Sequence, residues 1–227
     1  MTKQSGPTKE RELILDILME ILENGGYSHV VLKKALDKHQ YLEKQNRAFV
    51  TRVVEGTIEY LLTIDAVIDQ CSKIKVKKMK PVIRTILRMS VYQILQMDRI
   101  PDSAVCDEAV KLAVKRKFHG LKGFVNGVLR TITRNKEEIL NSESAFWQEL
   151  QKNPVQALSV RYSVPEWMIS LWEAQYGEEK TEPMLERLKK GRPLTIRLDS
   201  RLTEEEKAQE IAAIEVAGVT VQNHQLY

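Results

Sequence analysis

The chain has 227 residues, 43% of them apolar, which is enough for one large domain or two small ones with a proper core. Its first residues are polar, no apolar run approaches the length of a membrane span, and the two cysteines form no CxxC pair. These features argue against a secretory signal, a membrane anchor and a disulfide scaffold. They predict a reduced, cytoplasmic protein that makes no contact with a membrane.

The formal net charge of +4 hides an asymmetry between two parts of the chain. Residues 1–136 contain 25 Lys and Arg against 15 Asp and Glu, whereas residues 137–227 contain 10 against 16. Two acid-free stretches, 70–97 and 109–136, hold seven and eight basic residues. Charge of this kind favours binding of a polyanion to the first part of the chain. The alternative is two solvated helix faces.

Apolar residues recur at helical spacing throughout residues 1–136, and no stretch there alternates like a strand. The sequence therefore predicts a mainly α protein whose first domain is an all-helical bundle. The expected helices cover residues 8–24, a short piece near 30–36, 43–62, 64–71, 81–95, 101–117 and 123–134.

Residues 137–227 differ in character from the bundle. Residues 137–160 are predicted to be a linker with short helices, because acidic and turn-forming residues increase there. Residues 161–227 are predicted to form a small, incomplete α+β domain. It would hold a helix near 178–190, strands near 194–198 and 219–222, and a helix from Thr203 to about Val216 that opens with a capping box.

Basic residues at two helix starts form the main candidate binding surface. Lys9 and Arg11 open the first helix, where they oppose the helix dipole, so contact with a phosphate explains them about as well as solvation does. Phe124 lies among the basic residues and is a candidate for base stacking, with a role in the core as the alternative. The other candidates surround the glycine-containing turn: Lys117, Lys122, Asn126 and Arg130.

A lysine-rich loop before Pro81 is a secondary candidate surface. It contains Lys73, Lys75, Lys77, Lys78 and Lys80.

Several strings carry a resemblance to a known family. P-x-x-A-V-x-x-E-A-V followed by G-F-V-N-G-V-L-R, within residues 101–130, resembles the NusB-like RNA-binding fold. It is most similar to the version that opens the RsmB (Sun/Fmu) family of small-subunit rRNA cytosine-5 methyltransferases. R-T-I-L-R-M-S-V-Y-Q-I-L and V-x-G-T-I-E-Y match the family's bundle helices, and R-Y-S-V-P-E-W-M resembles its small pre-catalytic domain. The resemblance also implies that the first helix and the G-F-V-N-G segment lie near each other.

The same resemblance implies chemistry that this sequence does not carry. Members of the family use S-adenosylmethionine, a Gly-rich strand–helix turn and two cysteines, one after a Pro and one after a Thr. Here Cys71 follows Gln70 and Cys106 follows Val105, and both are interpreted as core residues. The four histidines show no metal-binding spacing. The chain is therefore expected to bind no metal or cofactor, to be inactive alone, and to hold ribosomal RNA for a missing methyltransferase domain.

Two other functions remain open from the residues alone. One is a free-standing NusB-like transcription antitermination or RNA-binding factor, against which the extension after residue 160 argues. The other is a protein–protein docking module whose basic face binds an acidic partner. A steep fall of affinity with salt would distinguish the RNA-binding functions from the docking module.

Overall fold

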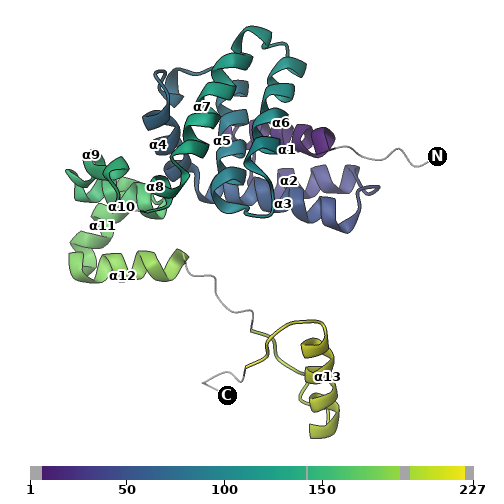
Figure 1. The fold of residues 1–227 in the computed structure, drawn as a ribbon. Helices are drawn as coiled ribbons and strands as arrows, with labels where there is room; N and C mark the ends of the chain where they lie inside the picture. Colours follow the sequence, from purple (N-terminus) through teal and green to yellow (C-terminus); the bar gives the residue numbers. More distant parts are fainter. Residues whose placement is uncertain (1–6, 142, 190–194, 223–227) are drawn as a thin grey trace. The chain divides into compact units, whose positions relative to one another are not determined.

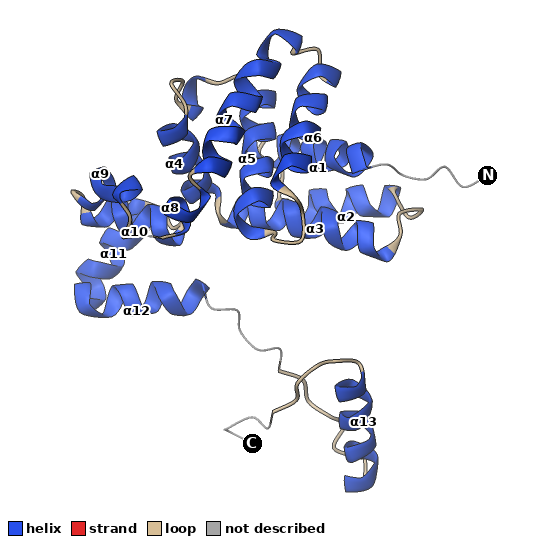
Figure 2. Ribbon diagram, viewed as in Figure 1, coloured by secondary structure: helices blue, strands red, loops and turns tan. Residues whose placement is uncertain are grey.

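The computed structural model describes residues 7–141, 143–189 and 195–222, and every regular element in these ranges is a helix (Figure 2). The prediction of a mainly α protein is thereby confirmed. Contacts divide the chain into two compact units, residues 1–186 and 187–227. None of the described helices is long and apolar enough to cross a membrane.

The first unit begins with a bundle of long helices joined by short turns (Figure 1). Its elements are α1 (Pro7–Leu22), α2 (Ser28–Lys38), α3 (Lys44–Glu59), α4 (Leu61–Cys71), η1 (Val76–Lys78), α5 (Pro81–Gln96), α6 (Asp102–Lys115), η2 (His119–Leu121) and α7 (Lys122–Arg134).

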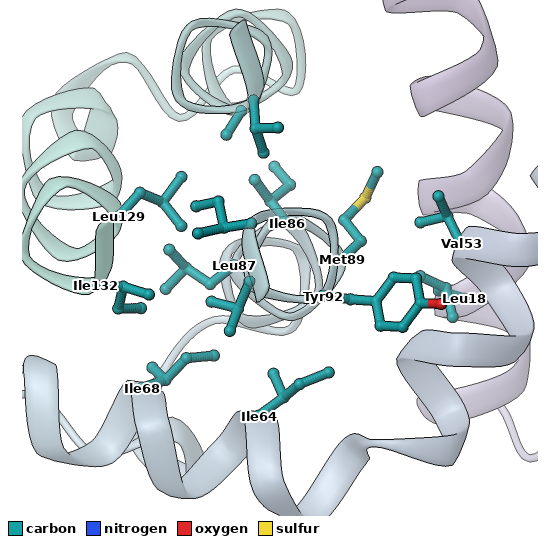
Figure 3. Packing of buried hydrophobic residues seen from close by; sticks show 14 of the residues in the cluster. Leu18, Val53, Ile64, Ile68, Ile86, Leu87, Met89, Tyr92, Leu129 and Ile132 are labelled. Atoms are coloured by element: carbon teal, nitrogen blue, oxygen red, sulfur yellow. The ribbon is translucent and has the colours of Figure 1, made fainter. Parts of the chain in front are cut away.

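Helix α5 lies at the centre of this bundle. It packs against α1, α3, α4, α6 and α7. Pro81 occupies its first turn, where the missing N–H has no cost. Buried side chains then follow on nearly every side of the helix, as expected for one enclosed by others. Figure 3 shows α5 with Ile86, Leu87, Met89 and Tyr92 among residues from the surrounding helices. Each large apolar side chain buried in this way contributes about 1.5–3 kcal/mol.

Gly56 allows α3 to approach α5 closely. A Cβ added at Gly56 would overlap the ring of Tyr92, which is fully buried. Only glycine leaves room for that ring. This contact gives a physical reason for the glycine in the V-x-G-T-I-E-Y string.

The rest of the first unit is a helical extension packed on the bundle. Its elements are α8 (Lys136–Leu140), η3 (Ala145–Trp147), α9 (Gln148–Gln151), α10 (Pro154–Tyr162), α11 (Glu166–Tyr176) and α12 (Glu178–Lys189). Helix α10 packs against α4. The Thr63 hydroxyl donates to the Val160 carbonyl at 2.5 Å, and the Leu62 N–H donates to the Ser163 hydroxyl at 3.1 Å. The extension thus has a defined attachment to the bundle.

The second unit contains α13 (Glu204–Val216), which opens with the predicted capping box between Thr203 and Glu206. The two predicted strands are wrong for the residues described: 195–198 and 219–222 have no regular structure, while residue 194 lies outside the description. Ile196 and Val219 are more than half exposed. Alternating apolar residues form a stable strand only with a core and further strands to pack against, and neither segment has them here.

Candidate nucleic-acid interface

Lys117, a candidate RNA-binding residue, lies in the turn between α6 and α7 in an unusual backbone conformation. Lys117 has a φ of 66°, in the left-handed region that favours glycine. Its N–H donates to Val114 O at 2.9 Å, and the Phe118 N–H donates to Ala113 O at 2.8 Å. These two bonds form the Schellman motif that ends α6. The Lys117 side chain is exposed at this fixed turn.

Helix α7 presents a polar face beyond the turn. Lys122 begins the helix and is exposed, and Arg130, eight residues or about two turns further along, is also exposed. Arg130 Nε donates to Asn126 Oδ1 at 3.2 Å, so the predicted placement of these two residues on one face is confirmed. Gly123 and Gly127 are also exposed, and a Cβ added at either would meet nothing within 4 Å. This face is therefore open and positively charged.

Phe124 lies at the edge of that face. Its ring is partly buried and packs against the core formed by the bundle helices. Phe118, in the turn itself, is placed in the same way. Each ring thus has a side anchored in the core and a part that reaches the surface.

The two candidates on α1 have different environments. Lys9 is exposed, but Arg11 is only 7% exposed. Arg11 Nε donates to Gln93 Oε1 on α5 at 3.1 Å, and its guanidinium lies 5.2 Å from the centroid of the Phe49 ring. Burial lowers the pKa of Arg11, and the carboxylates of Glu108 and Glu10 oppose this shift. The prediction that Arg11 faces a phosphate is thus corrected: it is an interior residue.

Helical phase explains the position of Arg11. It precedes Ile14, Leu15 and Leu18 by three, four and seven residues, and all three are buried. Residues at this spacing share one face of a helix. The position of Arg11 relative to the apolar residues of α1 therefore predicts that it faces the interior.

Two ion pairs join α1 to the end of α6. Lys115 Nζ lies 2.6 Å from Glu12 Oε2, and Arg116 Nη2 lies 2.5 Å from Asp16 Oδ1. They place α1 beside the end of α6 that leads into the turn. They also neutralise two of the eight cations counted in the second acid-free stretch, which reduces the positive charge around the turn.

The secondary candidates lie on a loop with a buried anchor. Lys73, Lys75, Lys77, Lys78 and Lys80 are all exposed, whereas Val76 and Met79 between them are buried. Asp69 Oδ1 accepts the Val76 N–H at 2.6 Å, and Lys75 Nζ donates to the Asp69 carbonyl at 3.2 Å. The loop therefore presents its lysines from a fixed backbone.

The two arginines downstream of this loop are paired within the bundle. Arg84 binds Glu23 through two nitrogens, and Arg88 makes two 2.7 Å bonds to the carboxylate of Asp65. The hydrogen bond to Glu23 raises the pKa of Arg84. The cations of the first acid-free stretch that face solvent are thus those of the loop.

The cysteines have the properties of core residues. Cys106 is buried and Cys71 is half-buried, and neither forms a disulfide. Burial raises the pKa of Cys71 to about 11 and also raises that of Cys106. A thiol with a raised pKa is a poor nucleophile, because little thiolate is present near neutral pH. Within the described ranges, no three His, Cys, Asp or Glu residues are grouped as metal ligands.

Comparisons with known proteins agree with the limits of the bundle. Residues 8–134, which end at the last residue of α7, match the NusB family. The transcription antitermination protein NusB of Thermodesulfovibrio yellowstonii is 32% identical over 147 residues, 60% of this chain and 96% of that protein. A crystal structure of the antitermination factors NusB and NusE in complex with dsRNA matches with a TM-score of 0.52 at 20% identity. This match covers 56% of this chain and 95% of the matched chain.

A second type of relative extends past the bundle. A Bacillus subtilis protein named probable ribosomal RNA small subunit methyltransferase B is 35% identical over 175 residues. The match covers 77% of this chain and 37% of that protein. The chain thus spans less than half the length of this relative.

Proposed function

Because this chain belongs to the NusB family, we propose that its helical bundle binds ribosomal RNA and holds it for a small-subunit rRNA cytosine-C5 methyltransferase domain. The observation that carries this proposal is the similarity to the Bacillus subtilis protein, because the aligned region is longer than the region that matches the NusB family. It extends over 175 residues, whereas the NusB family matches residues 8–134 only. The extension on α4 is therefore part of what the two proteins share.

The α6–α7 surface, defined as Lys117, Lys122, Asn126 and Arg130 with the edge of Phe124, supports RNA as the ligand. Exposed cations on a fixed turn suit phosphate groups, whose contacts set the register of the RNA. The partly exposed ring of Phe124 beside them suits stacking on an unpaired base. The open backbone at Gly123 and Gly127 leaves room for a ribose or phosphate to approach closely.

The attachment of α10 to α4 supports a positioning role. The hydrogen bonds from Thr63 and Leu62 join the extension to the same rigid bundle that carries the α6–α7 surface. A catalytic domain that packs on this extension would be held in a limited range of positions relative to bound RNA. Holding two reactants in place in this way lowers the entropic cost of their reaction.

The described residues do not fit S-adenosylmethionine. They contain no strand and hence no Gly-rich strand–helix turn, and burial raises the pKa of both cysteine thiols, Cys71 half-buried and Cys106 buried. Methyl transfer is therefore assigned to a separate catalytic domain.

A free-standing NusB-type factor is the second candidate function. The match to the Thermodesulfovibrio protein, which covers 96% of that protein, favours it for the bundle taken alone. The helices α8–α12 lie beyond the 8–134 match to the NusB family. The 175-residue alignment with the methyltransferase relative includes part of this region, which favours the first function.

The substitution Phe124→Ala tests the proposed RNA surface. A lost base stack should weaken binding to a small-subunit rRNA fragment by about 1–3 kcal/mol without changing the salt dependence of the affinity. Fluorescence anisotropy at several salt concentrations measures both quantities, and a melting curve shows the folded fraction. If the folded variant binds RNA as tightly as the parent chain, Phe124 acts only in the core and the surface lacks its stacking residue.

A further inference from the structure

Helix α2 carries a second exposed group of aromatic and basic residues, which lies apart from the α6–α7 turn in Figure 1. Tyr27, immediately before α2, is 77% exposed, and Tyr41, shortly after it, is 75% exposed. Single exposed aromatic residues are common on protein surfaces. Here two of them bracket one helix of 11 residues, about 16 Å long.

Each tyrosine is accompanied by a histidine ring. The Tyr27 and His29 centroids are 6.3 Å apart, and those of His39 and Tyr41 are 5.6 Å apart. His39 Nδ1 lies 2.8 Å from the Ala35 carbonyl, which fixes its ring at the end of α2. Both ends of the helix thus present flat ring surfaces to solvent.

Cations occupy the helix between the rings. Lys33, Lys34 and Lys38 line a shallow open hollow of about 580 Å³ together with His29, Val30 and Asp37. In the described ranges none of the three lysines forms an ion pair, and Asp37 is the single acid lining the hollow. Lys38 lies in the last turn, where its positive charge interacts favourably with the helix dipole and stabilises the helix. Lys33 and Lys34 have no such local role.

We propose that this α2 surface, defined as Tyr27, Lys33, Lys34, Lys38 and Tyr41, binds a single-stranded segment of the RNA. Stacking rings separated by lysines match the repeating base and phosphate of a single strand. An acidic protein segment would pair with the lysines but would leave the two tyrosine rings without a partner of their own. A double helix would keep its bases stacked on each other and away from the rings.

The inference rests on the proposed function, and α1 gives it a structural basis. Helix α1 packs against both α2 and α6, and it carries the exposed Lys9. One RNA can therefore contact the α6–α7 surface through its structured part and α2 through an unpaired flank. The α2 surface would recognise an unpaired strand without reading its sequence, since every base offers a face for stacking.

The test uses the full chain, a small-subunit rRNA hairpin with a single-stranded uridine flank, and the same hairpin without the flank. Tyr27→Ala combined with Tyr41→Ala should weaken binding of the flanked RNA about fivefold or more, with an unchanged salt slope. Lys33→Gln combined with Lys34→Gln should reduce the slope of log affinity against log salt by about 1.4. Binding of the flankless hairpin should not change. Tyr176→Ala with Lys180→Gln, both exposed on the extension, is the matched control.

Cross-linking provides a second readout that does not depend on affinity. A flank that contains 4-thiouridine should form cross-links to peptides from residues 27–41. The inference is overturned if the α2 variants bind both RNAs with the affinity of the parent chain and no such cross-link forms. The proposed function still stands in that case, provided that the parent chain binds the hairpin. If the parent chain binds neither RNA, the proposed function fails as well.

Discussion

Helices α5 and α13 are stabilised in opposite ways. Eleven of the 16 residues of α5 are buried, yet no side chain caps its start. Helix α13 has a complete capping box, in which the Glu206 N–H donates to the Thr203 hydroxyl at 3.2 Å, yet it buries none of its 13 residues. Packing therefore specifies the bundle, whereas local signals alone specify α13. Variants in the two helices should therefore differ in how far their effects spread.

Gly56→Ala should damage the packing around α5 most. The added methyl group overlaps the Tyr92 ring, so we expect the free energy of unfolding to fall by about 3 kcal/mol. Gly127→Ala is the matched control, because its Cβ meets nothing within 4 Å and alanine favours a helix by about 1 kcal/mol. Urea unfolding measures both changes. Equal effects of the two substitutions would show that the contact between Gly56 and Tyr92 does not limit packing.

Arg11→Met removes a buried polar contact while it keeps most of the side-chain volume. Gln93 Oε1 loses the Arg11 donor, and we therefore expect the free energy of unfolding to fall by about 1–3 kcal/mol. The affinity of the folded protein for RNA should not change. Lys9→Met, two residues away and exposed, should leave stability within about 0.5 kcal/mol. Weaker RNA binding by Arg11→Met at unchanged stability would return Arg11 to the binding surface.

Lys117→Gly should separate stability from binding. Glycine adopts the left-handed φ of 66° without strain, so we expect the bundle to gain about 1 kcal/mol. One phosphate contact disappears, and the salt slope of RNA binding should shrink by about 0.7–0.9. Thermal melting and anisotropy measure the two effects. A gain in stability with unchanged RNA binding would remove Lys117 from the α6–α7 surface.

Thr203→Ala should affect α13 alone. Loss of the cap costs about 1 kcal/mol of local helix stability, and α13 has no buried residues to offset it. Hydrogen exchange of the α13 amides should accelerate, while the melting temperature of the bundle stays the same. A lower melting temperature of the bundle would mean that α13 contributes to its stability.

The sequence was sufficient for features that repeat within one helix. The apolar spacing located α5, α6 and α7, and the Thr203–Glu206 pattern located the start of α13. The placement of Asn126 and Arg130 on one face followed from their spacing of four residues. Each of these features depends on residues within a few turns of each other.

Features that depend on distant partners were not predictable in the same way. The ion pairs from Glu12 to Lys115 and from Asp16 to Arg116 join residues that are 103 and 100 positions apart. The charge of Arg11 alone predicts a surface position, whereas the phase of its helix places it on the buried face. The predicted strand near residues 194–198 rests on local alternation, and the one near 219–222 on a short apolar run after Gly218; neither pattern shows whether a core is available.

The salt dependence of RNA binding tests the central claim most directly. The triple variant Lys117→Gln, Lys122→Gln and Arg130→Gln should reduce the slope of log affinity against log salt by about 2–3 relative to the parent chain. Lys180→Gln, Arg187→Gln and Arg201→Gln remove the same charge outside the bundle and should leave the slope unchanged. Equal slopes for the two triple variants would contradict an RNA-binding surface at the α6–α7 turn.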